Sequence, residues 1–299
     1  MFAIIPMASR GNVILCDSVN RLADGIHHPL GTLLFIKALN LYAILKLLVL
    51  WPAMRLIGQH YNQHVPTTVK GKLLLAPKIV AVFSIDLFFG LALLLFAVIF
   101  LLRPRYFLLI VFCWISFNFY LITLPLANGS DILLYVLAFW SVFMIAYPGF
   151  ENKILHAGQN VIANLGWLAC QMQVVIIYFV SGADKVMSPI WRSGEAIDYV
   201  THFDILFPSY LTFLQGQEWI NLVVSWFTIT FELGFVVFVW FRKTRILFLV
   251  TGILFHLCIA VMLSIPEFSL LMILSYITFL KENEAERLVK KFRLCRFVN

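Results

Sequence analysis

The sequence predicts an all-α integral membrane protein, a polytopic bundle of about eight transmembrane helices with an interfacial helix after the fifth. Of the 299 residues, 62% are hydrophobic and only 12% are charged, whereas soluble domains carry about a quarter charged residues. The hydrophobic residues form runs about as long as a bilayer is thick. The net charge of +7 lies in short loops and the tail. The positive-inside rule explains it there, so no nucleic-acid partner is expected.

The hydrophobic runs divide the chain into three segments. We expect an N-terminal surface segment at 1–29, a polytopic membrane domain at 30–280 and a basic amphipathic tail at 281–299. Residues 188–217 are too polar to cross a bilayer, and their one-sided apolar pattern predicts the interfacial helix. The expected spans are 30–51, 78–102, 106–126, 132–147, 161–182, 219–241, 246–265 and 267–280.

An even number of spans places both termini on one side of the membrane. That side holds the basic turns and the basic tail, so the positive-inside rule makes it the cytoplasmic side of a cell (inner) membrane. Four ionisable residues should then lie near the opposite surface: Lys185, Asp131, Glu195 and Glu267. Judged only by expected depth in the membrane, the three carboxylates are better partners for Lys185 than Glu232 is.

The most informative run is 171–194, QMQVVIIYFVSGADKVMSPIWRSG. It reads as an apolar helix that ends in a small-residue break at Ser181-Gly182. Gln171, Tyr178 and Lys185 are spaced by seven residues, nearly two helical turns, so they form one polar stripe. Such a stripe should face other helices or a wet cavity, because lipid offers no hydrogen-bond partners. The alternative is that Lys185 snorkels to the interface from a helix end.

Other polar residues fall inside the spans. Counted from their shared basic turn, Glu232 and His256 stand at similar depth, which predicts a contact between them; its structural alternative is a hydrogen bond that locks two helices. Asp86 is a functional candidate by its position in a span, or a carboxylate satisfied by Lys37 or Lys46. No Cys/His spacing typical of a metal site is present.

Two blocks of sequence carry a resemblance to a known family. The run YFVSGADKVMSPIWRSGEA resembles the core motif of the horizontally transferred transmembrane (HTTM) domain family. That family includes the membrane part of vitamin K-dependent gamma-glutamyl carboxylase and the SdpB-like proteins of sporulation-delaying peptide systems. The block FELGFVVFVWFRKTRILFLVTGILFH, followed by SIPEFSLLMIL, resembles the family's later helices in the right order and spacing.

The resemblance implies roles for particular residues. By motif position Lys185 matches the carboxylase lysine that deprotonates a reduced quinone; Asp184 replaces the lysine before it, and no histidine occurs near 128–131. The catalytic candidates are Lys185, Tyr178, Glu232 and His256. The substrate-binding candidates are Gln171, Ser181, Gly182, Trp191, Asp131 and Glu267.

Three hypotheses about function stay open. The first is an SdpB-like protein with an outward-facing, Lys185-centred pocket that acts on or helps mature an exported peptide or protein. The second is a carboxylase-like enzyme in which Lys185 is the base toward a quinone-type lipid. The third is a non-enzymatic scaffold or immunity component whose partners are membrane lipids and a peptide or membrane protein. A transporter is less favoured, because no broken helix pair or repeat symmetry is visible.

Overall fold

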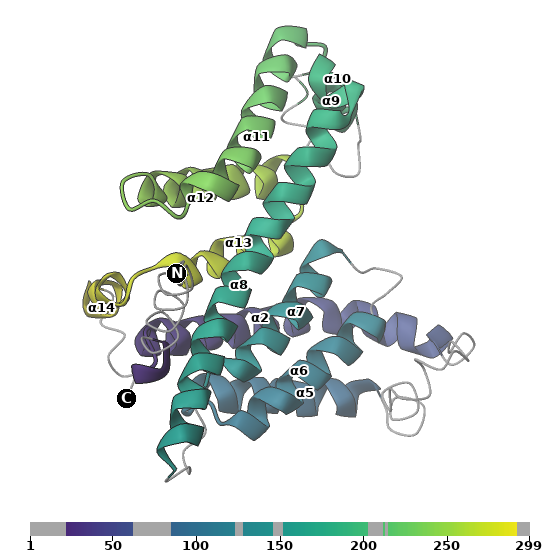
Figure 1. Ribbon diagram of the computed structural model, residues 1–299. Coiled ribbons are helices and arrows are strands. Elements are labelled where there is room, and N and C mark those ends of the chain that lie inside the picture. Colours follow the sequence, from purple (N-terminus) through teal and green to yellow (C-terminus); the bar gives the residue numbers. More distant parts are fainter. Residues whose placement is uncertain are drawn as a thin grey trace, which may run out of the picture.

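The computed structural model describes residues 22–61, 85–122, 128–145, 152–202, 212 and 215–291, and every regular element among them is a helix (Figure 1). The predicted N-terminal surface segment lies mostly outside these residues. In chain order the helices are α2 (Pro29–Tyr61), α5 (Ile85–Leu101), α6 (Tyr106–Ile122), α7 (Gly129–Phe143), α8 (Lys153–Met187), α9 (Pro189–Ser193), α10 (Glu195–Thr201), α11 (Glu218–Phe238), α12 (Arg245–Met262), α13 (Pro266–Ser275), the 3-10 helix η3 (Tyr276–Phe279) and α14 (Glu282–Lys291).

Each predicted span corresponds to an apolar helix of the structure. Four are long and apolar enough to cross a membrane: Pro29–Ala53, Lys153–Met187, Glu218–Phe238 and Arg245–Met262. Four further apolar helices are shorter: Asp86–Leu101, Tyr106–Leu121, Gly129–Phe143 and Pro266–Phe279. The all-helical architecture is therefore confirmed, with four helices that are candidates to cross a membrane, whereas the count of eight spans remains a prediction.

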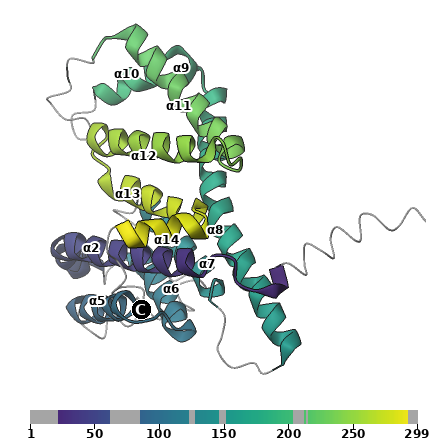
Figure 2. The same cartoon turned by 90° about the vertical axis from the view of Figure 1, so that its left-hand side faces the viewer.

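The helices pack mainly in pairs. α2 packs on α5, α6 on α7, α8 on α11, and α12 on α13. In Figure 2, α12, α13, α2 and α5 run in nearly the same direction in successive layers, while α8 crosses behind them. α8 also contacts α7, α11 and α13, so this helix connects the N-terminal and C-terminal halves of the bundle.

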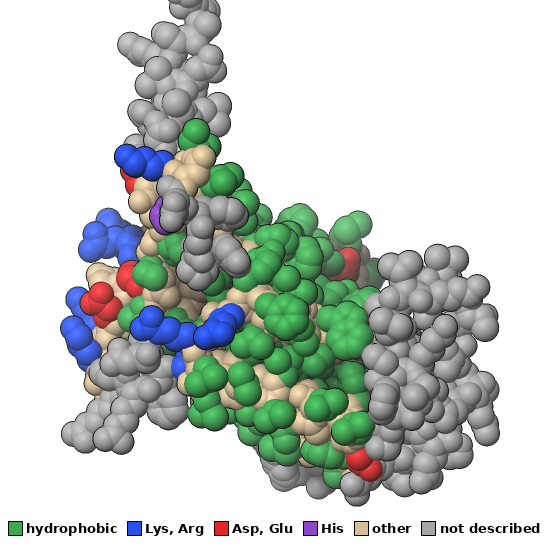
Figure 3. All heavy atoms as spheres, turned by 90° about the horizontal axis from the view of Figure 1, so that it is seen from below, with side chains coloured by type: hydrophobic (Ala, Val, Ile, Leu, Met, Phe, Trp, Pro, Cys, Tyr) green, Lys and Arg blue, Asp and Glu red, His purple; other side chains and the backbone are tan. Residues whose placement is uncertain are grey.

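Hydrophobic side chains both fill the interior and cover the outside. Buried aromatic rings form much of the core, among them Phe89, Phe112 and Phe235. Large apolar side chains such as Phe107, at 71% exposure, and Leu247, at 63%, point outward. Figure 3 shows a broad hydrophobic face with most of its Lys and Arg side chains toward one edge. Such a face is expected where the surroundings are lipid, since soluble proteins rarely expose large apolar patches.

The predicted helix break at Ser181-Gly182 is wrong. α8 continues to Met187, and its end coincides with Ser188 and Pro189, where α9 begins. A Cβ atom on Gly182 would lie 2.9 Å from Leu233 Cδ2 and 3.2 Å from Glu232 Cβ. The glycine therefore permits close approach of α8 and α11 instead of ending the helix, a common use of small residues between membrane helices.

The expected interfacial helix is two short helices, α9 and α10, joined at Gly194. This residue has φ 86°, a left-handed conformation that favours glycine. A Cβ atom there would lie 2.7 Å from the backbone nitrogen of Leu222 in α11. Gly194 thus allows the turn and also lets it pack tightly on α11. The rest of the expected segment, 203–217, lies largely outside the described residues.

The described part of the tail, α14, packs on α2. Both carboxylate oxygens of Glu282 accept hydrogen bonds from the first turn of α2, at 2.8 Å from Leu30 N and 3.3 Å from Gly31 N. Glu284 pairs with Arg245 at the start of α12, with Nη2–Oε1 at 2.6 Å. The described part of the amphipathic tail is therefore docked on the protein itself, and the rest of the predicted tail, 292–299, lies outside the described residues.

Candidate functional site

Lys185, in the last turn of α8, forms an ion pair with Glu232 in the middle of α11. Its Nζ atom lies 3.0 Å from Oε1 and 2.9 Å from Oε2 of the carboxylate. The lysine side chain is 16% exposed and the glutamate side chain 6% exposed. The pair is thus enclosed by protein, with the ammonium as its more accessible member.

The expectation that Asp131, Glu195 or Glu267 would be a better partner for Lys185 is wrong. That expectation assumed that α8 ends at Ser181 and compared depths along separate helices. Because α8 continues, Ser181, Gly182 and Lys185 stay on one helical face, and α11 packs closely against that face at Gly182.

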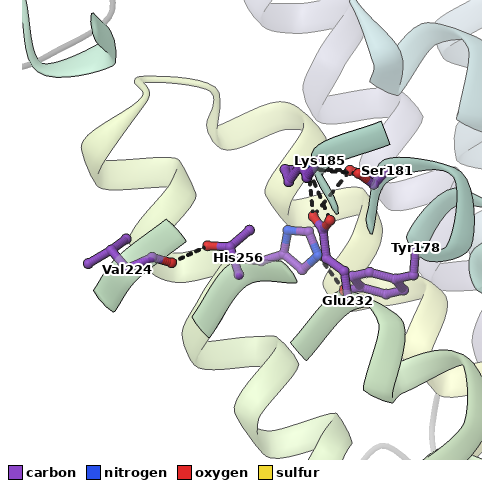
Figure 4. A network of polar contacts seen from close by, with 7 residues as sticks. Tyr178, Ser181, Lys185, Val224, Glu232 and His256 are labelled. Atoms are coloured by element: carbon purple, nitrogen blue, oxygen red, sulfur yellow. Dashed lines mark hydrogen bonds and ion pairs between the residues drawn. The ribbon is translucent and has the colours of Figure 1, made fainter. Parts of the chain in front are cut away.

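Two further side chains, Ser181 and Trp191, complete the surroundings of the ammonium, and Figure 4 shows the first of them. The hydroxyl of Ser181 accepts a hydrogen bond from Lys185 and donates one of 3.1 Å to Glu232 Oε1. The ring of Trp191, in α9, has its centroid 5.0 Å from Lys185 Nζ, which is within range of a cation–π interaction. A carboxylate, a hydroxyl and an aromatic face therefore hold the lysine, and we name Lys185, Glu232, Ser181 and Trp191 the lysine site.

A second group of polar side chains lies next to the lysine site, toward the start of α8. Tyr178, one turn before Ser181, has its hydroxyl 2.7 Å from Nε2 of His256 in α12. The same hydroxyl is hydrogen-bonded to the hydroxyl of Tyr276 in η3. His256 is 2% exposed, and its Nδ1 atom has no hydrogen-bond partner among the described residues. We name Tyr178, His256 and Tyr276 the buried triad.

The predicted contact between Glu232 and His256 is not formed as a hydrogen bond between the described side chains. Glu232 bonds to Lys185 and Ser181, whereas His256 bonds to Tyr178. Both residues contact α8, at positions one turn apart, and α8 supplies the hydrogen-bond partner of each.

The polar stripe of α8 faces other helices, as its spacing predicts. At its first position, Gln171 Nε2 donates a 2.6 Å hydrogen bond to the backbone oxygen of Thr278 in η3. At the second and third, Tyr178 contacts His256 and Lys185 contacts Glu232. Among the described residues, no group of three His, Cys, Asp or Glu side chains could hold a metal ion.

Asp131 and Glu267 belong to a separate charged cluster around Lys46 of α2. The Lys46 ammonium lies 2.7 Å from Asp131 Oδ1, 3.3 Å from Glu267 Oε2 and 2.6 Å from Ser130 Oγ. Lys46 and Asp131 have side-chain exposures of 1% and 2%. These contacts join α2, α7 and α13, so the two carboxylates predicted to bind substrate do not share a site with Lys185.

Asp86, the remaining intramembrane candidate, accepts a 2.6 Å hydrogen bond from Trp51 Nε1. Sequence reasoning left Asp86 as a functional candidate or as a carboxylate satisfied by Lys37 or Lys46, and it did not predict this indole partner. It also missed Tyr276, since a tyrosine in an apolar run is unremarkable by itself. The one signal in the sequence that could have indicated this close packing is Gly252 in α12. In the structure, a Cβ atom at Gly252 would collide with the Tyr276 hydroxyl.

Comparison with known proteins bears on this C-terminal half of the molecule. Residues 154–283 match the model of the HTTM domain, and this confirms the resemblance that the two sequence blocks indicate. The match contains the lysine site and the buried triad, whereas α2, α5, α6 and α7 precede it. No curated protein and no solved structure shows significant similarity to the chain.

Proposed function

From the HTTM domain that residues 154–283 form, we propose that this membrane protein acts on, or helps to mature, an exported peptide or protein at the lysine site. The observation that supports this proposal is the paired, partly exposed ammonium of Lys185. A ligand carboxylate or carbonyl can reach that ammonium beside Glu232, and Trp191 offers an aromatic surface next to it. The proposal places α9 and α10 outside the cell and both termini in the cytoplasm.

A carboxylase-like reaction on a quinone-type lipid is the second candidate, and it also uses the Lys185–Glu232 pair. A lysine acts as a base only when its amine is uncharged. In this candidate the proton of the ammonium would pass to the Glu232 carboxylate, whose oxygens lie 3.0 and 2.9 Å from Lys185 Nζ. Glu232 would then store the proton while the Lys185 amine accepts another from the ligand.

A non-enzymatic scaffold or immunity component is the third candidate. It is favoured by the three contacts that Lys185 already makes, with Glu232, Ser181 and Trp191. A hydrogen-bonded ion pair of this kind is sufficient to hold α8 against α11 without any ligand. In that case Lys185 would have no ligand of its own. Substitution should then affect folding and no other property.

The decisive experiment compares peptides secreted by cells that make the wild-type protein or a variant, measured by mass spectrometry. Lys185→Met and Glu232→Gln should remove any mature peptide that depends on this protein. Lys153→Met is the matched control, because Lys153 is exposed at the other end of the same helix. A maturation pattern that is the same in all variants present at wild-type levels in the membrane would contradict the proposal and favour the scaffold.

Lys185→Arg separates binding from proton transfer. An arginine keeps the positive charge but does not lose its proton in a protein. If the role of Lys185 is to hold an anionic ligand group, this variant should keep a substantial part of the maturation. If the amine is a base, Lys185→Arg should be as inactive as Lys185→Met.

A further inference from the structure

A cavity of about 290 Å³ lies at the end of the bundle where α2 begins, α5 joins α6 and α7 ends. Its volume is close to the lower limit for small-molecule sites. The walls are mainly aliphatic and come from three separate parts of the chain. The residues that bear on the argument are Thr32, Leu33, Ile36, Arg103, Met144 and Ile145.

The charge at this cavity is positive. Arg103 is exposed, and no ion pair joins it to another described residue. Lys37, the residue after Ile36, lies close enough to Arg103 for the two charges to repel each other. Arg105, in the same turn, is also exposed. Among the described lining residues there is no carboxylate.

The acidic residue that caps this end of α2, Glu282, is not among the residues that line the cavity, and no ion pair joins it to Arg103 in the described part of the chain. Both oxygens of Glu282 are already occupied by the backbone N–H groups of Leu30 and Gly31. An anion at Arg103 would therefore meet a guanidinium with free hydrogen-bond donors. Guanidinium groups bind phosphates with particularly strong, charge-assisted hydrogen bonds.

We propose that this cavity binds one anionic phospholipid, with its phosphate at Arg103 and the upper part of an acyl chain against Leu33, Ile36 and Met144. Both halves of the site are needed for this ligand. A free phosphate would leave the aliphatic walls unused, and an uncharged lipid would leave the guanidinium without a partner. The positive end of a membrane protein is also where anionic headgroups concentrate.

The site is independent of the lysine site. Every described residue that lines the cavity precedes residue 154, where the HTTM match begins. The lipid would therefore be a structural or regulatory ligand of α2, α5, α6 and α7. Failure of this inference would leave the proposed function of Lys185 untouched, and the reverse also holds.

Native mass spectrometry of the delipidated full-length protein tests the proposal, with phosphatidylglycerol and phosphatidylcholine added in titrations. The wild type should bind one phosphatidylglycerol clearly more tightly than further copies and more tightly than phosphatidylcholine. Arg103→Gln should weaken that first binding step roughly tenfold or more, because a charge-assisted hydrogen bond is lost. Arg105→Gln, an exposed arginine of the same turn, should leave it within about twofold.

A second variant tests the apolar half of the site without changing charge. Leu33→Trp places a larger side chain in the cavity at a half-buried position and should weaken the first phosphatidylglycerol without altering later, surface-bound copies. Equal effects of Arg103→Gln and Arg105→Gln would overturn the proposal, because they would show a diffuse electrostatic surface. Unchanged binding in both Arg103→Gln and Leu33→Trp would overturn it as well.

Discussion

The ammonium of Lys185 and the carboxylate of Glu232 depend on each other, and this gives a prediction at the scale of single residues. Lys185→Met should destabilise the folded protein by about 1–3 kcal/mol, since it leaves Glu232 enclosed without its counter-charge. The double variant Lys185→Met with Glu232→Gln should recover part of that loss. Thermal unfolding in detergent measures both; a double variant less stable than Lys185→Met alone would contradict the mutual dependence.

Gly252 controls the position of the buried triad. A Cβ atom at this residue would collide with the Tyr276 hydroxyl and would lie 2.8 Å from Cζ, and Tyr276 is itself 4% exposed and stacked on Phe235. Because that rigid ring has little space to move, Gly252→Ala should lower stability by about 1–3 kcal/mol. Gly90→Ala is the control, since in the described part of the chain no atom beyond its chain neighbours and its own helix backbone lies within 4 Å of its Cβ position. Equal melting temperatures for the two variants would show that Tyr276 has room to shift.

The identities of the important residues were easier to predict than their partners. Lys185, Glu232 and His256 stand out because ionisable groups inside membrane spans are costly and seldom accidental. Their pairing depends on helix rotation and close approach, which spacing within one helix does not contain. The separate Lys46 cluster shows this well: the sequence indicated a buried lysine and two carboxylates, and only the packing of α2, α7 and α13 brings them together.

At the scale of elements, α14 fastens the C-terminal part of the chain onto the start of α2. Glu282→Ala removes the two hydrogen bonds to Leu30 and Gly31 and should expose the amides of α14 and of the first turn of α2 to faster hydrogen exchange. The expected effect is about tenfold, which corresponds to losing one capping interaction. Glu286→Ala, an exposed position on the same helix, should change the exchange of neither segment. Identical exchange in the two variants would mean that α14 is held by its apolar contacts alone.

The junction of α2 with α8 should be sensitive to acid. His28, just before α2, stacks on Trp167 of α8 with ring centroids 5.0 Å apart. Burial lowers the pKa of His28 below its usual value of 6.5, and the nearby Glu282 offsets this only in part. The folded state therefore binds this proton less readily than the unfolded state, so stability is retained above pH 6.5 and decreases as the pH falls below it.

This pH effect can be assigned to one side chain. His28→Phe keeps an aromatic ring against Trp167 but cannot be protonated, so the loss of melting temperature between pH 7.5 and 5.5 should be smaller than in the wild type. His156→Phe removes an exposed histidine and should leave the pH dependence as it is. An unchanged acid response in His28→Phe would assign the effect to other groups.

The existence of the helices was predictable, and their ends were less so. Runs of apolar residues as long as a bilayer leave helix as the natural structure, because every backbone group must be hydrogen-bonded in lipid. The end of α8 was misplaced because Ser181 and Gly182 are typical both of helix ends and of close helix contacts. The same ambiguity at Gly194 hid the division of the interfacial segment into α9 and α10.

At the scale of the whole molecule, charged groups gather in separate places, one of which is an end of the bundle. One end holds Glu282 with the start of α2, Arg245 with Glu284, and the Arg103 turn beside the cavity. The two other clusters lie away from this end. Lys46 is in the middle of α2, and Lys185 is near the C-terminal end of α8. The number of membrane crossings, predicted from the sequence as about eight, can be tested directly.

Cysteine accessibility in intact cells tests the crossings one by one. In a background without native cysteines, Gly129→Cys and Ser193→Cys should react with a membrane-impermeant thiol reagent. Arg105→Cys, Lys153→Cys and Lys243→Cys should react only after the membrane is made permeable. If Gly129→Cys is protected while Ser193→Cys reacts, α6 and α7 do not cross and the count of eight is wrong. Protection of Ser193→Cys together with labelling of Lys243→Cys would reverse the orientation.

The length of α8 has a consequence for how a ligand arrives. Its 35 residues extend for roughly 52 Å, whereas the hydrocarbon interior of a bilayer is about 30 Å thick. Even a strongly tilted helix of this length has some turns outside the hydrocarbon region, and Lys185 lies only two residues from the C-terminal end of α8. A ligand would then reach the Lys185 amine at the membrane–water interface. A hydrophilic peptide would therefore not have to enter the hydrocarbon region of the bilayer.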